Sequence, residues 1–179
     1  GDQVVGIDCG EEVNAWLNKV LRKTGLRLIR LNNEVERMVS TGQGPSSSVA
    51  LSNQSQYLII NEKSVTWLMD SLPPDCDFAK DNFIKRFRSN FVFDGNCPAL
   101  QEEHWDRVVI GQTDFWVTGV CNRCTITCVD PVTGVKSREP YVTLHNHYKG
   151  YPKFGIYLAK MTRHEVVLRV GDEVIPFLK

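Results

Sequence analysis

The feature that most constrains the fold is the density of short apolar runs, each bounded by glycine, proline, aspartate or other turn-forming residues. Runs of four to eight residues that alternate in polarity, or are wholly apolar, are typical of β-strands. Many short strands separated by turns favour a barrel or a sandwich. The expected strands lie at 26–31, 57–60, 90–93, 107–110, 115–120, 124–129, 155–160, 165–170 and 173–178, the last two joined by a turn at Gly171 and Asp172.

Three stretches read as helices instead. Residues 11–22 carry apolar side chains at helical spacing and are followed by Gly25, which predicts a helix that stops there. Shorter helices are expected over 64–72, before two prolines, and over 81–88. Residues 32–55 form a long polar stretch, and its part over 32–48 is predicted to be a mobile loop. We therefore expect an α+β, β-rich fold, with one domain over residues 1–179 that forms a distorted β-barrel with peripheral helices.

The charge balance bears on the class of partner. The 21 basic side chains are matched by 21 acidic ones. Proteins that bind nucleic acid usually carry a basic excess, so we expect no nucleic-acid partner. No apolar run approaches the ~20 residues that span a bilayer, and the first ten residues do not resemble a signal peptide, so no membrane partner is expected. Crowded cysteines without a secretory signal favour a reducing, cytoplasmic location.

Three cysteines within eight residues give the strongest chemical signal. They are Cys121, Cys124 and Cys128, and the last two would share one face of a strand over 124–129. A turn that contains Pro131 follows this strand. The cluster is therefore expected where a strand begins, close to a tight turn.

Spacing alone leaves three interpretations of this cluster open. The thiols can be small buried apolar groups. Alternatively, Cys121 and Cys124 can bind zinc with help from His145 and His147, which are expected in a polar loop. In the third interpretation one thiolate binds a soft metal, while Arg123 stabilises that thiolate and binds an anionic ligand.

Longer segments resemble one family. The run CNRC at 121–124, followed by DPVTG at 130–134, resembles the C-x-R-C and D-x-x-T-G signature of MOSC domains, the C-terminal domains of molybdenum cofactor sulfurases. Three further segments resemble motifs of that family in the same order, namely RFRSN at 86–90, WD with IG between 105 and 111, and FGIY with VGD between 154 and 172. The resemblance covers nearly the whole chain and implies the distorted barrel of that family.

Within the family, the sequence is most similar to the eukaryotic molybdenum cofactor sulfurase branch. The final run VIPFLK and the run NQSQYL at 53–58 favour this branch. The mitochondrial amidoxime-reducing branch has proline where this chain has Ser89, and serine where it has Asn122.

The resemblance assigns a metal ligand and three cofactor contacts. Cys124 matches the cysteine that binds molybdenum in the amidoxime-reducing relatives, so it is the expected metal ligand and catalytic residue. A thiolate suits a soft, dithiolene-bound metal. Arg88, Asn90 and Arg123 match residues that contact the pterin and phosphate of the molybdenum cofactor (molybdopterin), for which a guanidinium fork and an amide are suitable partners.

Two further cofactor contacts are weaker matches. Ser55 corresponds to a hydroxyl near the phosphate, and Asn122 to a contact made mainly through the backbone. Cys121 and Cys128 are expected to be packing residues. No histidine is expected to act in catalysis.

The resemblance also implies a function and partners. The chain would bind molybdenum cofactor and present it for oxo-to-sulfido exchange, and the sulfurated cofactor would pass to xanthine dehydrogenase and aldehyde oxidase. The sulfur would arrive as a persulfide from an N-terminal cysteine-desulfurase-like domain that holds pyridoxal phosphate. That domain and the family's N-terminal β-barrel lobe are absent from the sequence, so we expect a fragment whose sulfurtransferase activity belongs to a longer enzyme.

Two other functions stay open from the sequence. One is a molybdenum-dependent reductase of N-hydroxylated compounds. The other, from a different class, is a structural zinc or interaction domain without a redox role.

Overall fold

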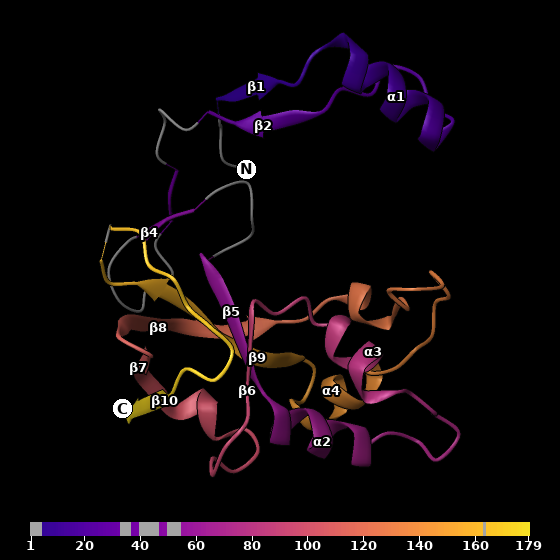
Figure 1. The fold of residues 1–179 in the computed structure, drawn as a ribbon. Coiled ribbons are helices and arrows are strands. Elements are labelled where there is room, and N and C mark those ends of the chain that lie inside the picture. Colours follow the sequence, from indigo (N-terminus) through magenta and orange to yellow (C-terminus); the bar gives the residue numbers. More distant parts are fainter. Residues whose placement is uncertain (1–4, 33–36, 40–46, 50–54, 163) are drawn as a thin grey trace.

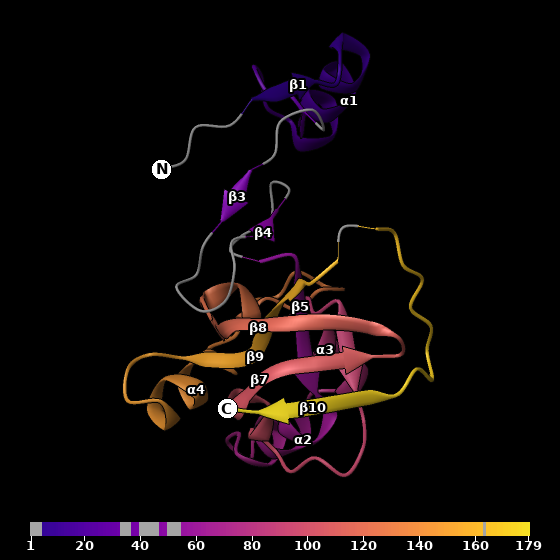
Figure 2. The same cartoon turned by 90° about the vertical axis from the view of Figure 1, so that its left-hand side faces the viewer.

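A six-stranded sheet curls into a half-barrel and dominates the computed structural model, which describes residues 5–32, 37–39, 47–49, 55–162 and 164–179 (Figures 1 and 2). All neighbouring strands are antiparallel except β5 and β6, which run parallel. This curled sheet with helices outside it confirms the predicted β-rich α+β fold. The strand order is β10 (Val174–Leu178), β7 (Trp105–Ile110), β8 (Thr113–Asn122), β9 (Lys153–Lys160), β5 (Tyr57–Asn61) and β6 (Phe91–Phe93).

Three helices lie on one side of this sheet (Figure 1). They are α2 (Glu62–Asp70), α3 (Lys80–Lys85) and α4 (Tyr141–His147). The same part of the chain also contains two short 3-10 helices, η1 (Gln101–His104) and η2 (Thr125–Cys128). The side chain of Asn61 caps α2 by accepting a hydrogen bond from the Lys63 N–H. Helices α2 and α3 form the crossover that a parallel pair of strands requires.

The N-terminal residues form a small separate unit. Strands β1 (Gly6–Asp8) and β2 (Ile29–Leu31) pair, and α1 (Glu11–Leu21) lies between them in sequence. The helix ends at Arg22 in a left-handed conformation, three residues before the glycine that was expected to stop it. Its apolar face is not buried, and Trp16 is 61% exposed. The predicted mobile connection falls largely outside the described residues, although β3 (Met38–Val39) and β4 (Ser47–Ser48) pair within it.

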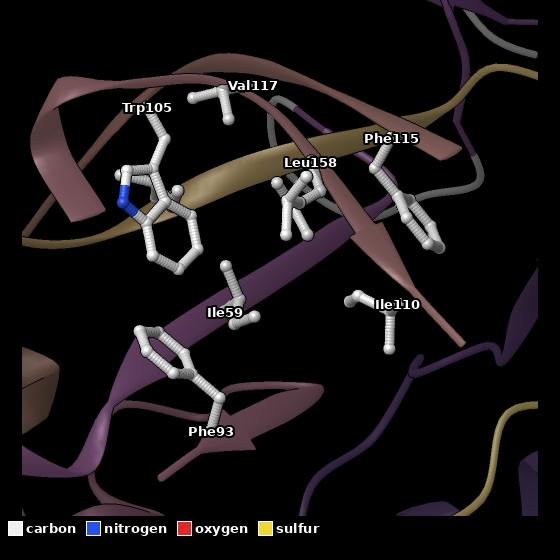
Figure 3. Close-up of a cluster of buried hydrophobic side chains, with 9 residues drawn as sticks. Ile59, Phe93, Trp105, Ile110, Phe115, Val117 and Leu158 are labelled. Atoms are coloured by element: carbon white, nitrogen blue, oxygen red, sulfur yellow. The ribbon is translucent and has the colours of Figure 1, made fainter. Parts of the chain in front are cut away.

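Two apolar clusters fill the two faces of the sheet, because successive side chains of a strand point to opposite faces. Ile59 belongs to the cluster inside the curl, whose side chains converge from five strands (Figure 3). Its neighbour Ile60 belongs to the cluster between the sheet and the helices, together with Leu68, Phe83 and Phe154. Strand β5 thus holds both layers together.

A bulge in β9 turns Phe154 toward the helices. The β8–β9 register shifts between Val120 and Asn122, and Gly155 in the partner strand has a φ of +74°. Strict alternation would place Phe154 on the same face as Ile156, whereas the structure buries the two in different clusters. A Cβ on Gly155 would lie 2.6 Å from Ile60 Cγ2 and 2.7 Å from the Ile59 carbonyl, so only glycine fits here.

Three sequence predictions of local structure are wrong. Residues 124–129 are not a strand, because η2 occupies most of this range. Residues 165–170 are mostly apolar yet form no strand, and β10 pairs with β7 instead, so no hairpin surrounds Gly171. His145 and His147 lie in α4, not in a polar loop. In each case local alternation or polarity was a weaker determinant than tertiary contacts.

A buried carboxyl group links η1 to the start of α2. Glu102 is fully buried and accepts hydrogen bonds from the Ser64 hydroxyl (2.7 Å) and the Asn61 amide (3.3 Å). Over the described part of the chain, no basic side chain forms an ion pair with it. Burial therefore raises the pKa of Glu102 above its ordinary value.

We expect Glu102→Gln to remove a pH-dependent loss of stability. Above the ordinary pKa of 4.5, the folded state still holds a proton that the unfolded state has released. The free energy of unfolding of the unchanged protein therefore falls as pH rises toward the raised pKa, and the amide variant lacks this slope. Thermal unfolding from about pH 5 to about pH 8 measures it. Glu103→Gln is the control, because Glu103 is paired with Lys153 and Tyr148 and its loss leaves the buried carboxyl in place; equal slopes in all three proteins would contradict the prediction.

Candidate functional site

Cys124 is exposed at the point where β8 gives way to η2. Its carbonyl accepts hydrogen bonds from the backbone N–H (3.3 Å) and the hydroxyl (3.1 Å) of Thr127, which close the first turn of η2. Because this turn replaces the expected strand, Cys124 and Cys128 do not share a face. Cys128 is buried, as predicted for a packing residue, while Cys124 is exposed.

Arg123 holds the turn to two other segments. Its Nε and Nη2 donate to the Phe154 carbonyl (2.9 and 2.6 Å), and its Nη1 donates to the Phe87 carbonyl (3.0 Å). The guanidinium also lies 5.3 Å from the centre of the Phe87 ring. Its backbone N–H donates to the Pro152 carbonyl. Arg123 thus fixes the position of the neighbouring thiol relative to β9 and the end of α3.

The charge of Arg123 has no acidic partner. Among the residues that the structure describes, no carboxylate forms an ion pair with it. Burial lowers the pKa of Arg123, although an arginine stays protonated at neutral pH. Three of its five N–H groups are used by backbone carbonyls, which do not neutralise a cation. A cation that is desolvated in this way favours an anion nearby.

The segment after α3 brings two of the predicted cofactor contacts to the same region. Arg88 is exposed, has a φ of +53°, and forms no side-chain hydrogen bond or ion pair within the described residues. Asn90 exchanges hydrogen bonds with the backbone of Leu58: its side-chain oxygen accepts from the Leu58 N–H (2.8 Å), and its own N–H donates to the Leu58 carbonyl (2.9 Å). The amide NH₂ of Asn90 is thereby oriented, and the guanidinium of Arg88 is available to a ligand.

The two weaker matches differ in position. Asn122 is the last, exposed residue of β8 and pairs with Lys153 of β9, next to Arg123. Ser55 is buried, and its hydroxyl donates to the Leu158 carbonyl (2.8 Å) and lies 3.1 Å from the Thr118 hydroxyl. None of these contacts reaches Arg88, Asn90 or Cys124, so the structure does not join Ser55 to the other candidates.

The described residues do not form a zinc site. Within the described part of the chain, no group of three or more histidine, cysteine, aspartate or glutamate side chains is placed to hold a metal ion. His147 packs against Trp67 and Tyr148. Cys121 is 4% exposed, and burial raises the pKa of its thiol. A thiolate pair from Cys121 and Cys124 is therefore disfavoured.

Arg86 is a residue of this region that the sequence did not single out. Its side chain is buried and contacts the turn that follows Cys124, whereas Arg88, two residues later, is exposed. Both arginines belong to the run RFRSN, and nothing in the run itself tells which one points inward. A signal was available in Asp130, an acidic residue within the DPVTG turn, which is the ion-pair partner of Arg86.

These features define a class of β-rich domain in which an exposed cysteine, just after a strand of the curled sheet, follows a half-buried arginine that has no acidic partner among the described residues. A sequence model of the MOSC domain matches residues 46–175. The chain belongs to the MOSC domain family. No described helix is long and apolar enough to cross a bilayer.

Several curated proteins are similar to nearly the whole chain. Molybdenum cofactor sulfurase 1 of Aedes aegypti is 39% identical over 176 residues, which cover 96% of this chain and 22% of that protein. The molybdenum cofactor sulfurases of Danio rerio and Bos taurus are 37% and 33% identical, over 98% and 99% of this chain and 22% of each protein. The chain thus spans about a fifth of the length of these relatives.

Proposed function

We propose that the chain binds molybdenum cofactor beside Cys124 and presents it for oxo-to-sulfido exchange, as the cofactor-binding part of a longer sulfurtransferase. The observation that carries the proposal is the half-buried Arg123, whose guanidinium has no carboxylate partner among the described residues and which is followed directly by the exposed Cys124. The relatives, which are named molybdenum cofactor sulfurases, support the same choice.

The residues present fit the chemistry of this cofactor. The cofactor is anionic through its phosphate and dithiolene groups, and when bound it supplies a soft metal centre that accepts a thiolate. Arg123 would balance negative charge next to Cys124, and the free fork of Arg88 would bind the phosphate bidentately. Asn90, held by Leu58, would direct its amide NH₂ to the pterin edge. Asn122 would contribute backbone contacts. Ser55 would act indirectly, because its hydroxyl donates a hydrogen bond to the Leu158 carbonyl and so helps to fix the position of β9.

Arg88→Asn is expected to lower cofactor retention. The substitution removes the guanidinium, and asparagine tolerates the positive φ of this position better than most residues do. Loss of one charge-assisted contact costs roughly 1.5–3 kcal/mol, or about ten- to a hundredfold in affinity. Molybdenum and pterin per chain, in protein from a host grown with molybdate, measure it.

The matched control is Lys85→Asn, which removes an exposed positive charge at the end of α3, three residues before Arg88. This control should retain the content of the unchanged protein. Equal content in both variants would remove Arg88 from the site.

The further partners stay predictions of the resemblance. We propose that sulfur reaches the site from a desulfurase-like part of the longer protein that carries pyridoxal phosphate, and that xanthine dehydrogenase and aldehyde oxidase, in the cytoplasm, receive the product. Transfer of labelled sulfur from cysteine to cofactor, in a protein that includes both parts, tests the first step. Reduction of a hydroxylated amidine with an artificial electron donor would favour the alternative, a molybdenum-dependent reductase.

A further inference from the structure

We propose that Arg86 is a positioning residue for Cys124, because its guanidinium ties the turn that carries this thiol to the segment that carries Arg88. The role of the Cys124 thiol in binding the cofactor rests on the proposed function. The contacts of Arg86 with the segment after Cys124 do not depend on that function. Arg86 is not among the residues to which the family resemblance assigns a role.

The side chain of Arg86 makes three contacts, two of which are with the segment after Cys124. Its Nη2 lies 3.0 Å from Oδ2 of Asp130, and its Nη1 donates to the Thr127 carbonyl at 3.4 Å. Its guanidinium carbon lies 4.5 Å from the centre of the Phe78 ring, just before α3. The side chain is only 3% exposed. The contacts with Thr127 and Asp130 join the end of α3 to η2 and to the turn that follows it.

Asp130 is itself organised by the backbone of its turn. Its Oδ1 accepts hydrogen bonds from the N–H groups of Val132 (3.0 Å) and Thr133 (2.8 Å), so that Oδ2 faces Arg86. These backbone bonds, together with Arg86, hold the pKa of Asp130 below its ordinary value. The partner of Arg86 is therefore an ionised carboxylate in a fixed orientation at neutral pH.

The tie is reciprocal. Arg86 donates to the Thr127 carbonyl, three residues after Cys124, and Arg123 donates to the Phe87 carbonyl, one residue before Arg88. Each of the two segments, 86–88 and 123–127, thus donates a guanidinium hydrogen bond to a backbone carbonyl of the other. A shift of either segment would break both hydrogen bonds, so this exchange fixes the backbone around Cys124 relative to the backbone that leads into Arg88.

The energetics favour a role in geometry over a role in stability. The Nε atom of Arg86 is buried and finds no acceptor among the described residues. A buried ion pair with an unpaired polar atom seldom adds net stability compared with an apolar side chain of similar size. We therefore infer that the main effect of the Arg86–Asp130 pair is to fix the orientation of the turn that contains Asp130.

The test compares Arg86→Met with a matched control, Arg107→Met, in strand β7. Arg107 also pairs with an aspartate, Asp114, and its guanidinium also lies over an aromatic ring, that of Phe177 at 4.6 Å. Arg107→Met therefore removes contacts of the same kind from β7, in a part of the fold that does not include η2. Hydrogen exchange of the Thr127 and Val129 amides, whose bonds close η2, reports the turn, and exchange within β8 reports the whole fold.

In Arg86→Met we expect the η2 amides to exchange about ten- to a hundredfold faster, with exchange in β8 unchanged. A nitroxide attached to Cys124, in a background with Cys9, Cys76 and Cys97 replaced by serine, should become more mobile. Arg86→Lys, which keeps the charge opposite Asp130, should restore part of both signals. Arg107→Met should change neither.

Two results would overturn the proposal: equal exchange of the η2 amides in Arg86→Met and the unchanged protein, or equal acceleration throughout the fold. Molybdenum per chain is the separate measure of the proposed function. If the unchanged protein holds no molybdenum while the η2 amides respond locally, the proposed function fails and the positioning role stands.

Discussion

Cys124→Ser is expected to abolish nearly all molybdenum binding, whereas Cys121→Ser leaves the metal in place. Cys124 is exposed beside the cationic Arg123, and a hydroxyl is a poor substitute for a soft thiolate donor. Cys121 is almost fully buried at the end of β8, and burial raises the pKa of its thiol, so it is protonated at neutral pH. Serine at this position should lower the melting temperature without removing the metal.

The measurement is molybdenum and zinc per chain in the two variants and the unchanged protein, all expressed with excess molybdate. Equal loss of zinc from both variants, with no molybdenum in any sample, would support the structural zinc alternative. Full molybdenum in Cys124→Ser would leave a cofactor-binding domain in which Cys124 is not the ligand.

Gly155→Ala is expected to have the largest effect on stability. The residue has a left-handed φ, which costs about 1–2 kcal/mol for a residue with a Cβ. The added carbon would also lie within 3 Å of Ile60 Cγ2 and the Ile59 carbonyl. Overpacking of this kind adds about 1–3 kcal/mol. The total of about 2–5 kcal/mol lowers the melting temperature by roughly 2–4 °C per kcal/mol in a chain of this length.

Gly134→Ala separates the two contributions. Gly134 has nearly the same φ, +72°, but no atom within 4 Å of the position that a Cβ would take. It should therefore show only the conformational cost, and the difference between the two variants measures the contact with β5. Equal melting temperatures would mean that β5 moves aside freely, contrary to the packing of both clusters against it.

The sequence predicted the strands that bury apolar side chains well. Strands β5, β7, β8 and β9 lie close to their expected ranges, because alternation and turn residues agree there with the tertiary structure. Strand β10 also lies close to its expected range, although most of its side chains are exposed. The resemblance located Arg88, Asn90, Arg123 and Cys124, which the structure places on adjoining segments. Their roles as cofactor contacts stay predictions.

What the sequence could not provide depends on contacts between distant residues. The alternation C-I-C at 124–128 fits a strand, yet the bonds of Arg123 to Phe87 and Phe154 and the bulge at Gly155 end β8 at Asn122. In 165–170, only Leu168 packs against the core, and Val167 stays exposed. The inward direction of Arg86 depends on Asp130, 44 positions later, which no local pattern reveals.

The hydrogen bonds of Arg123 join residues that are far apart in the sequence, which has a consequence for when a ligand can bind during folding. Arg123 bonds carbonyls that lie 36 positions before and 31 positions after it, so the arrangement is absent until most of the chain has collapsed. A ligand that needs this arrangement binds the native state and not the unfolded ensemble. Saturation at a hundred times the dissociation constant would then add about 2.7 kcal/mol to the free energy of unfolding. Cells that lack the ligand would hold a less persistent protein, and its abundance would follow ligand supply.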